Sequence, residues 1–233
     1  MERRLAAILS ADVVAYTRLI EADEVGTFER LKKLRLDHVE PLVSAHHGRI
    51  FKLTGDGALA EFPSATEAVQ CAVKIQDIVQ LEEAAQLENR RITLRIGISL
   101  GDVIIEDGDR HGEGVNLAAR LQQIAGPGGI LVSASVYEQV KNRLKVRMEP
   151  LGAQRLKNIS TPVPVFRLVL AGEKRRASFF PSSLALACLL VSSRRAGPAH
   201  GRWRFCRLAL PAARRRCLEE TGCGRPSSPS HLQ

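Results

Sequence analysis

The chain has 233 residues, of which 45% are apolar, enough to build the core of one sizeable domain with an appendage. Its formal net charge of +9 would by itself indicate a nucleic-acid- or membrane-binding protein. However, residues 172–233 hold 12 of the 34 Lys and Arg but only 3 of the 25 Asp and Glu, which leaves 22 of each sign in residues 1–171. The first part is therefore electrically balanced, and no nucleic-acid recognition motif accompanies the basic excess.

In chain order, the first part alternates strand and helix patterns. An apolar strand at 5–14 is followed by a short helical segment at 17–22 and a longer helix at 24–45. Strands at 49–53 and 58–62 flank Thr54-Gly55-Asp56-Gly57, a hairpin signal, and Ser64 with Glu67 forms a capping box for the next helix.

Further patterns complete the first part. Strands at 92–99 and 102–106 are predicted to join through Leu100-Gly101. A helix carrying Asn116 and Arg120, a strand at 130–133, a helix at 134–141 and late strands at 144–151 and 162–170 follow. This order predicts an α+β fold, a ferredoxin-like βαββαβ sheet with helices on one face and additional C-terminal strands, over residues 1–171.

The tail, residues 172–233, has a different composition. It contains no Asp, Asn, Ile, Tyr or Met and is rich in Arg, Ala, Ser, Leu, Pro and Cys. Its longest apolar run, 184–191, has eight residues, against roughly 20 needed to cross a bilayer, so membrane contact is not expected. We expect the tail to be disordered or non-native, and out-of-frame translation of a GC-rich gene is one hypothesis.

The cysteines and the N-terminus indicate the compartment. Cys71 lies alone in an apolar helical pattern and is expected to pack as a small hydrophobe, while the other four cysteines, in the tail, lack zinc-site spacing. The N-terminus has no signal-peptide pattern. We therefore expect a cytoplasmic protein without a disulfide framework.

Polar residues gather near predicted strand ends and helix starts. Asp12 lies near the end of the first strand, and Lys52 and Asp56 lie around the hairpin turn. Asn116 and Arg120 are four apart, so they share one helix face, and they follow a Gly-rich loop. Two carboxylates, a Lys, an Asn and an Arg suit metal-assisted phosphate chemistry.

Four motifs in order resemble class III nucleotidyl cyclases, the bacterial adenylate cyclase type included. They are Ala11-Asp12-Val13-Val14-Ala15-Tyr16-Thr17, Phe51-Lys52-Leu53-Thr54-Gly55-Asp56-Gly57, Gly112-Glu113-Gly114-Val115-Asn116-Leu117-Ala118-Ala119-Arg120-Leu121 and Leu156-Lys157-Asn158 followed by Pro162-Val163. The match spans residues 4–170. Ala15 stands where the family often has Gly, and Arg110-His111 replaces a more usual apolar–aromatic pair, which is expected to affect the purine pocket or loop closure.

The resemblance implies a reaction in which the ribose 3′-hydroxyl of a nucleoside triphosphate attacks its own α-phosphate and expels pyrophosphate. Asp12 and Asp56, with the carbonyl of Val13, would hold two Mg²⁺ or Mn²⁺ ions per site. Read without the resemblance, Asp56 is a turn residue and Asp12 is a strand-end cap.

Other roles follow from the same resemblance. Backbone amides near Tyr16 and Thr17, together with Lys157, would bind the terminal phosphates. Asn116 would orient the ribose, and Arg120 would stabilise charge on the α-phosphate. The structural alternatives are that Asn116 caps a helix, that Arg120 decorates its solvent face, and that Lys157 is a solvated loop residue.

The base is predicted from Lys52 and Asp109. Lys can donate to adenine N1 and Asp can accept from its exocyclic amine, whereas guanine presents the opposite pattern, so ATP is expected as substrate. In the family, the metal carboxylates and the other groups come from different subunits, and this chain carries both sets, which implies a homodimer with shared sites. The alternative is a catalytically silent cyclase-homology domain that serves dimerisation or nucleotide sensing.

Overall fold

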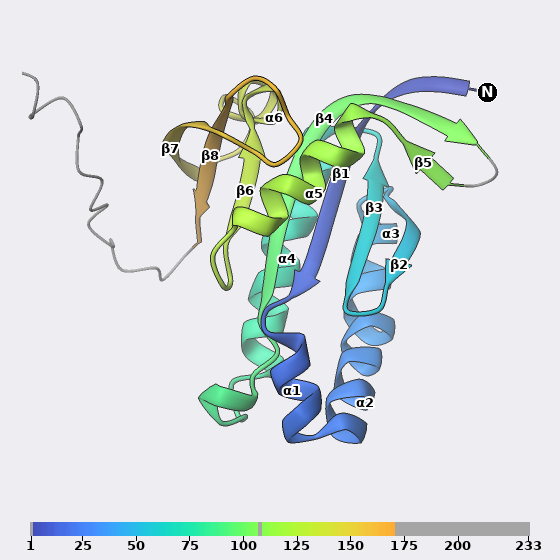
Figure 1. The fold of residues 1–233 in the computed structure, drawn as a ribbon, viewed down its shortest axis with the longest axis vertical. Coiled ribbons are helices and arrows are strands. Elements are labelled where there is room, and N and C mark those ends of the chain that lie inside the picture. Colours follow the sequence, from blue (N-terminus) through green and yellow to red (C-terminus); the bar gives the residue numbers. More distant parts are fainter. Residues whose placement is uncertain (1, 107–108, 171–233) are drawn as a thin grey trace, which may run out of the picture. The chain divides into compact units, whose positions relative to one another are not determined.

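The computed structural model describes residues 2–106 and 109–170 (Figure 1). All of them lie within the predicted first domain, residues 1–171, whose boundary stays a prediction. The predicted basic tail, residues 172–233, lies outside the described residues, so its expected disorder or non-native origin stays a prediction. Among the helices of the described part, none is long and apolar enough to span a membrane.

An eight-stranded sheet is formed by the described residues. Its order is β2-β3-β1-β4-β6-β8-β7, with β5 paired to β4, and every adjacent pair is antiparallel except β4 and β6. The strands are β1 (Glu2–Val13), β2 (Arg49–Thr54), β3 (Gly57–Phe62), β4 (Leu94–Glu106), β5 (Asp109–His111), β6 (Ile130–Ser133), β7 (Arg147–Gln154) and β8 (Val163–Val169). The order β2-β3-β1-β4 is that of a ferredoxin-like βαββαβ core, which confirms the predicted fold class.

The predicted turn at Leu100-Gly101 is wrong, because β4 runs through it without interruption. β1 pairs with β4 from Glu2 opposite Ile105 to Val13 opposite Leu94, so the two long strands support each other over their whole length. Gly101 instead permits close packing, since a Cβ there would lie 3.2 Å from the Cα of Gly114.

Seven helical segments and one 3₁₀ turn connect the strands. They are α1 (Tyr16–Ala22), α2 (Glu24–Leu34), the π-helical turn η1 (Arg35–Val39), α3 (Glu40–Ala45), α4 (Ala65–Glu82), η2 (Glu88–Arg90), α5 (Glu113–Ile124) and α6 (Ala134–Val140). The predicted helix at 24–45 is thus continuous but widens at η1. Pro41 explains the widening, because it has no N–H to donate and its ring clashes with the carbonyl four residues earlier.

Apolar side chains cover both faces of the sheet. Ala7 and Leu9 of β1 belong to the large core under α2, α3, α4 and α6, while the alternate residues Ala6 and Ile8 pack with Ala118 of α5. Figure 1 shows α4 and α5 on opposite sides of β1 and β4. The core helices therefore lie on one face as predicted, and α5 is an addition on the other face.

Candidate active site

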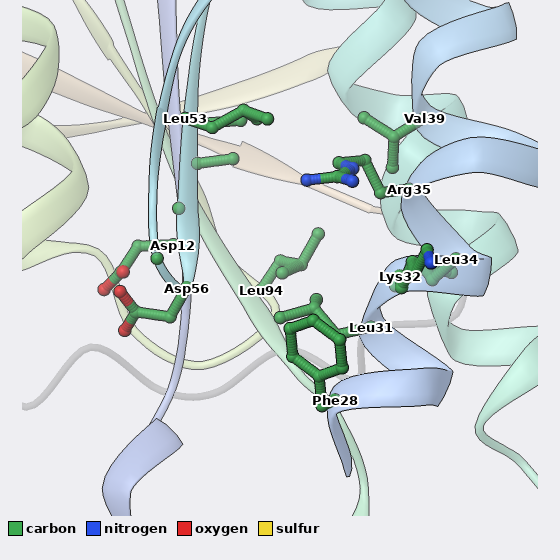
Figure 2. A pocket seen from close by; sticks show the side chains of 14 residues that line it. Asp12, Phe28, Leu31, Lys32, Leu34, Arg35, Val39, Leu53, Asp56 and Leu94 are labelled. Atoms are coloured by element: carbon green, nitrogen blue, oxygen red, sulfur yellow. The ribbon is translucent and has the colours of Figure 1, made fainter. Parts of the chain in front are cut away.

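Asp12 and Asp56 lie together where β1 ends beside the β2–β3 turn. Asp12 pairs with Gly57 across the sheet, and the Val13 amide donates to the Asp56 carbonyl oxygen over 3.2 Å. Figure 2 shows the two carboxyl groups side by side. Both residues lie at the edge of a cavity of about 100 Å³, which they line together with Phe28 and other side chains, and in Figure 2 their carboxyl groups point away from Phe28.

The electrostatics of this pair favour a cation. Burial and the neighbouring Asp12 carboxylate raise the pKa of Asp56, and Arg95 offsets part of this effect. Two hard carboxylate oxygen donors beside one backbone turn fit Mg²⁺ or Mn²⁺, which take one or two carboxylates and complete their coordination with water and phosphate oxygens. Within the described residues no group of three or more His, Cys, Asp and Glu forms a fuller cage.

Two further side chains hold Asp12 and were missed by sequence reasoning. Arg95 of β4, opposite Asp12 in the register, donates to Asp12 Oδ2 over 2.7 and 3.2 Å, and Gln122 of α5 donates to the same oxygen over 3.1 Å. A charged Arg95 inside an otherwise apolar strand pattern was the available signal. These contacts orient the Asp12 carboxylate from two different elements.

Lys52 and Asp109 form a second polar pair, on β2 and β5. Lys52 Nζ donates to Asp109 Oδ2 over 2.5 Å, and the Arg110 amide donates to Asp109 Oδ1 over 2.8 Å. The bond from Lys52, followed by that from the amide, lowers the pKa of Asp109, so this exposed carboxyl group is ionised at neutral pH. The arrangement presents an ammonium donor and a carboxylate acceptor next to each other.

Asn116 and Arg120 lie on the outer face of α5, away from the Asp12–Asp56 pair. Gln122, two residues after Arg120, is buried against the sheet and contacts Asp12, and residues two apart in an α-helix point about 200° apart. Asn116 is exposed, and Arg120 donates to Gln123 over 2.8 Å. The structure therefore does not bring these two residues to the carboxylates of the same chain.

Glycines fix the close packing of α5. Gly112, which precedes the helix, has φ 134°, and a Cβ there would lie 2.7 Å from the Asp102 carbonyl oxygen. On β4, a Cβ at Gly97 would lie 2.3 Å from the Ala118 carbonyl oxygen. The helix that carries Asn116 and Arg120 thus rests almost directly on strand backbone.

The remaining predicted site residues lie in separate places. Val13 is buried at the end of β1, and Tyr16 and Thr17 begin α1, after Ala15 in the left-handed region with φ 54°. Lys157 is exposed in the turn between β7 and β8. Their predicted roles toward metal or phosphate stay predictions.

Arg110, one of the two departures from the family motif, is buried and ion-paired. Its Nε and Nη2 donate to Glu61 of β3 over 3.0 and 2.8 Å, and Arg4 of β1 donates to the same carboxylate over 2.6 Å. Arg110 also lies over the Phe51 ring, with its Cζ 5.5 Å from the ring centroid. Sequence reasoning identified Arg110 as unusual but gave no indication of Glu61.

Comparison with known proteins supports one family. The model of the adenylate and guanylate cyclase catalytic domain matches residues 3–168. Putative adenylate cyclase 3 of Rhizobium meliloti (strain 1021) is 45% identical over 166 residues, which are 71% of this chain and 28% of that protein. The chain therefore spans less than a third of that relative's length.

Solved structures agree. The crystal structure of an adenylate/guanylate cyclase/hydrolase from Silicibacter pomeroyi is 42% identical, with a TM-score of 0.67, and the match covers 73% of this chain and 99% of that one. The adenylyl cyclase CyaB from P. aeruginosa, 24% identical with a TM-score of 0.62 over 76% of this chain and 98% of that one, shares the fold. The chain thus belongs to the family of adenylate and guanylate cyclase catalytic domains.

Proposed function

We propose that this domain is an adenylate cyclase, which converts ATP to 3′,5′-cyclic AMP and pyrophosphate in a homodimer whose two sites are shared between the chains. The observation that carries the proposal is the division of the polar groups between two surfaces. One surface presents the paired carboxylates of Asp12 and Asp56, and another presents Asn116 and Arg120. The family membership supplies the reaction class.

Base selection follows from the Lys52–Asp109 pair. Adenine offers an acceptor at N1 and a donor at its 6-amino group, which match the Lys52 ammonium and the Asp109 carboxylate. Guanine offers a donor at N1 and an acceptor at O6. The Lys52 ammonium would then face another donor, and the Asp109 carboxylate would face another acceptor. A site built from this donor and acceptor favours ATP because the wrong base leaves charged groups unpaired.

Asp12, Asp56 and the carbonyl of Val13 would hold the metal ions. When bound, a pair of Mg²⁺ or Mn²⁺ ions lowers the pKa of the ribose 3′-hydroxyl and neutralises charge on the phosphate oxygens. The contribution of the chain is to prepare this site: Arg95 and Gln122 fix the orientation of the Asp12 carboxylate before any ligand arrives.

Charge on the α-phosphate would be stabilised by Arg120, and Asn116 would hold the ribose. Asn116 and Arg120 are separated by about one helical turn on the outer face of α5, so both side chains can reach the same nucleotide. Arg120 is permanently charged and donates from a planar fork, and its present partner is the neutral side chain of Gln123. Exchange of that bond for bonds to a phosphate costs little. By resemblance, Lys157 would bind the terminal phosphates together with the amides near Tyr16 and Thr17.

The dimer follows from the same geometry. Asp12 faces Gln122 on the inner side of α5, while Arg120 points to the opposite side. A second copy can supply its Asn116 and Arg120 to the Asp12–Asp56 pair, and two-fold symmetry then builds two equal sites. The alternative, a catalytically silent dimerisation or sensing domain, is less favoured because the chain keeps every one of these groups.

Product analysis tests the proposal. Purified full-length chain is incubated with ATP or GTP and Mn²⁺ or Mg²⁺, and the products are separated by chromatography. We expect cyclic AMP and pyrophosphate from ATP, no product with a chelator, and little cyclic GMP. Substitution of both Lys52→Glu and Asp109→Cys should reduce the preference for ATP by at least about tenfold. Cyclic GMP as the main wild-type product, or no cyclic nucleotide, would contradict the proposal.

A further inference from the structure

Arg4, Glu61 and Arg110 form a buried ion cluster, which we call the Glu61 cluster. Arg110 and Glu61 are only 5% and 7% exposed, whereas the Arg4 side chain is 44% exposed. Burial opposes ionisation of Glu61, but the hydrogen bonds from Arg110 and Arg4 outweigh it and hold the pKa of this carboxyl group below its usual value. The Glu61 carboxyl group is therefore ionised at neutral pH.

Stability alone does not account for such a cluster. Charged groups lose their hydration when they are buried, and apolar side chains of similar volume often serve as well or better. What a two-bond Arg–carboxylate pair adds is a fixed direction and distance, because both bonds form only when the planar groups are aligned.

The cluster is joined to the Lys52–Asp109 pair on both sides. Arg110 follows Asp109 directly, and its amide donates to Asp109 Oδ1. Its guanidinium group lies over Phe51, the residue before Lys52. Glu61 of β3 thus restrains, through one arginine, the segments that carry both members of the pair.

Among the described residues, the other restraints on Asp109 are a short strand and an approach of His111 Nε2 to Asp109 Oδ2 at 3.9 Å. β5 has three residues, which pair with Ile104, Ile105 and Glu106 at the end of β4. A strand this short fixes its side chains weakly by its ladder alone. The bonds from Arg110 to Glu61, which join segments 49 residues apart, anchor it to the neighbouring part of the sheet.

We propose that Glu61 and Arg110 are positioning residues that set the spacing between Lys52 and Asp109, and hence the selectivity for adenine over guanine. This inference rests on the proposed function. Neither residue needs to touch the nucleotide, since each acts through the members of the pair. Loss of the alignment should therefore weaken recognition of the base more than the chemical step.

Steady-state kinetics of three full-length variants test the inference. Glu61→Gln removes the charge, and Arg110→Lys keeps the charge but not the two-bond fork. We expect both to raise KM for ATP about tenfold and to lower the ratio of kcat/KM for ATP over GTP about tenfold, with kcat changed less than about twofold. Arg4→Gln is the matched control, because it also removes a bond to Glu61 but leaves both bonds between Arg110 and Glu61 in place; we expect it to leave the ratio unchanged.

The outcomes separate the inference from the proposed function. If the wild type makes cyclic AMP and both test variants retain its KM and its base preference, the inference is overturned and the function stands. It is also overturned if Arg4→Gln and the test variants lose kcat and thermal stability in parallel. If the wild type makes no cyclic nucleotide, the proposed function fails and the inference with it. Glu61→Asp, which keeps the charge but shortens the reach, replaces Glu61→Gln if that variant does not fold.

Discussion

The proposed shared active site makes a quantitative prediction about mixed dimers. An Asp12→Ala chain lacks a metal carboxylate in both sites of its homodimer, and an Arg120→Ala chain lacks the phosphate-binding guanidinium in both. A heterodimer of the two has one site with neither substitution and one with both, because each site takes Asp12 from one chain and Arg120 from the other. Heterodimers isolated through two different affinity tags should therefore show about half of wild-type activity, and a random equal mixture about a quarter.

The position of Arg120 on α5 is the reason to expect that each active site is shared between two chains. On α5, Gln122 reaches Asp12 of its own chain, and Arg120, about 200° around the helix, points away from it. No rotamer of Arg120 carries its guanidinium through the helix to the inner side. Within one chain, therefore, Arg120 and Asp12 are expected to act in different sites.

A cis arrangement of the same substitutions is the decisive control. When Asp12→Ala and Arg120→Ala are placed on one chain and paired with a wild-type chain, each shared site contains one substitution, and the heterodimer should be inactive. If each chain completed its own site, the results would be reversed: half activity in cis and background activity in trans. Asp77→Ala and Gln123→Ala, which remove an exposed carboxylate and the present partner of Arg120, serve as matched surface controls.

Three further predictions concern the elements that hold the site. Because the pKa of Asp56 is raised, its carboxyl group binds a proton more tightly in the folded protein than in the unfolded chain. The free energy of unfolding therefore falls as pH rises through the raised pKa, and this loss of stability persists at neutral pH. Asp56→Asn should therefore stabilise the metal-free protein by at most about 1 kcal/mol, because solvent screens the pair, and Mn²⁺ should raise the melting temperature of the wild type but not of the variant. Ala15→Gly should increase the free energy of unfolding in urea by about 1 kcal/mol, because Ala15 has φ 54°; an unchanged value would contradict this account of its strain. Gly97→Ala should cost about 3 kcal/mol or more and abolish activity, since its Cβ would meet the backbone of α5, whereas Gly126→Ala, with no atom within 4 Å of its Cβ, should be neutral in both assays.

Local patterns predicted much of the fold. The strand at 130–133 has the predicted bounds, and Ser64 caps α4 by accepting from the Glu67 amide over 3.3 Å. The Glu67 carboxylate, however, contacts His46 Nδ1 at 2.7 Å, a residue 21 positions away, which no capping pattern could reveal. Cys71 is fully buried in the main core, which confirms the prediction that it packs as a small hydrophobe, and burial raises the pKa of its thiol to about 12.

The errors have identifiable causes. The strand predicted at 144–151 is β7, Arg147–Gln154, in which Pro150 and Gly152 flank a change of register. Both residues normally signal a turn, but β7 is at the edge of the sheet, where proline and a bulge are tolerated. Gly101 was wrongly predicted to be in a turn for a similar reason. A glycine that allows a helix to pack closely on a strand cannot be distinguished, from the sequence alone, from a glycine that allows a turn.

The sequence supplied candidate site residues, whose roles stay predictions, but it did not supply their geometry. The i, i+4 spacing placed Asn116 and Arg120 on one face of a helix, yet which face met the sheet depended on Gly97 and Gly101 of β4. The contact between Arg95 and Asp12 joins residues 83 positions apart, and it exists only because β1 and β4 pair in one register. The sequence could propose chemical groups, because those follow from residue type and motif, but not the contacts between them.

This dependence on register has a consequence for the activity. A shift of β4 by one residue against β1 would turn Arg95 to the other face of the sheet and leave the Asp12 carboxylate without its main partner. Gln122 could not replace Arg95, because its side chain is neutral and extends from α5. The packing of α5 on β4 would also change with the shift. The long, uninterrupted pairing of β1 and β4 therefore fixes the direction of the Asp12 carboxylate, to which, in the proposed dimer, a partner chain would present its Asn116 and Arg120.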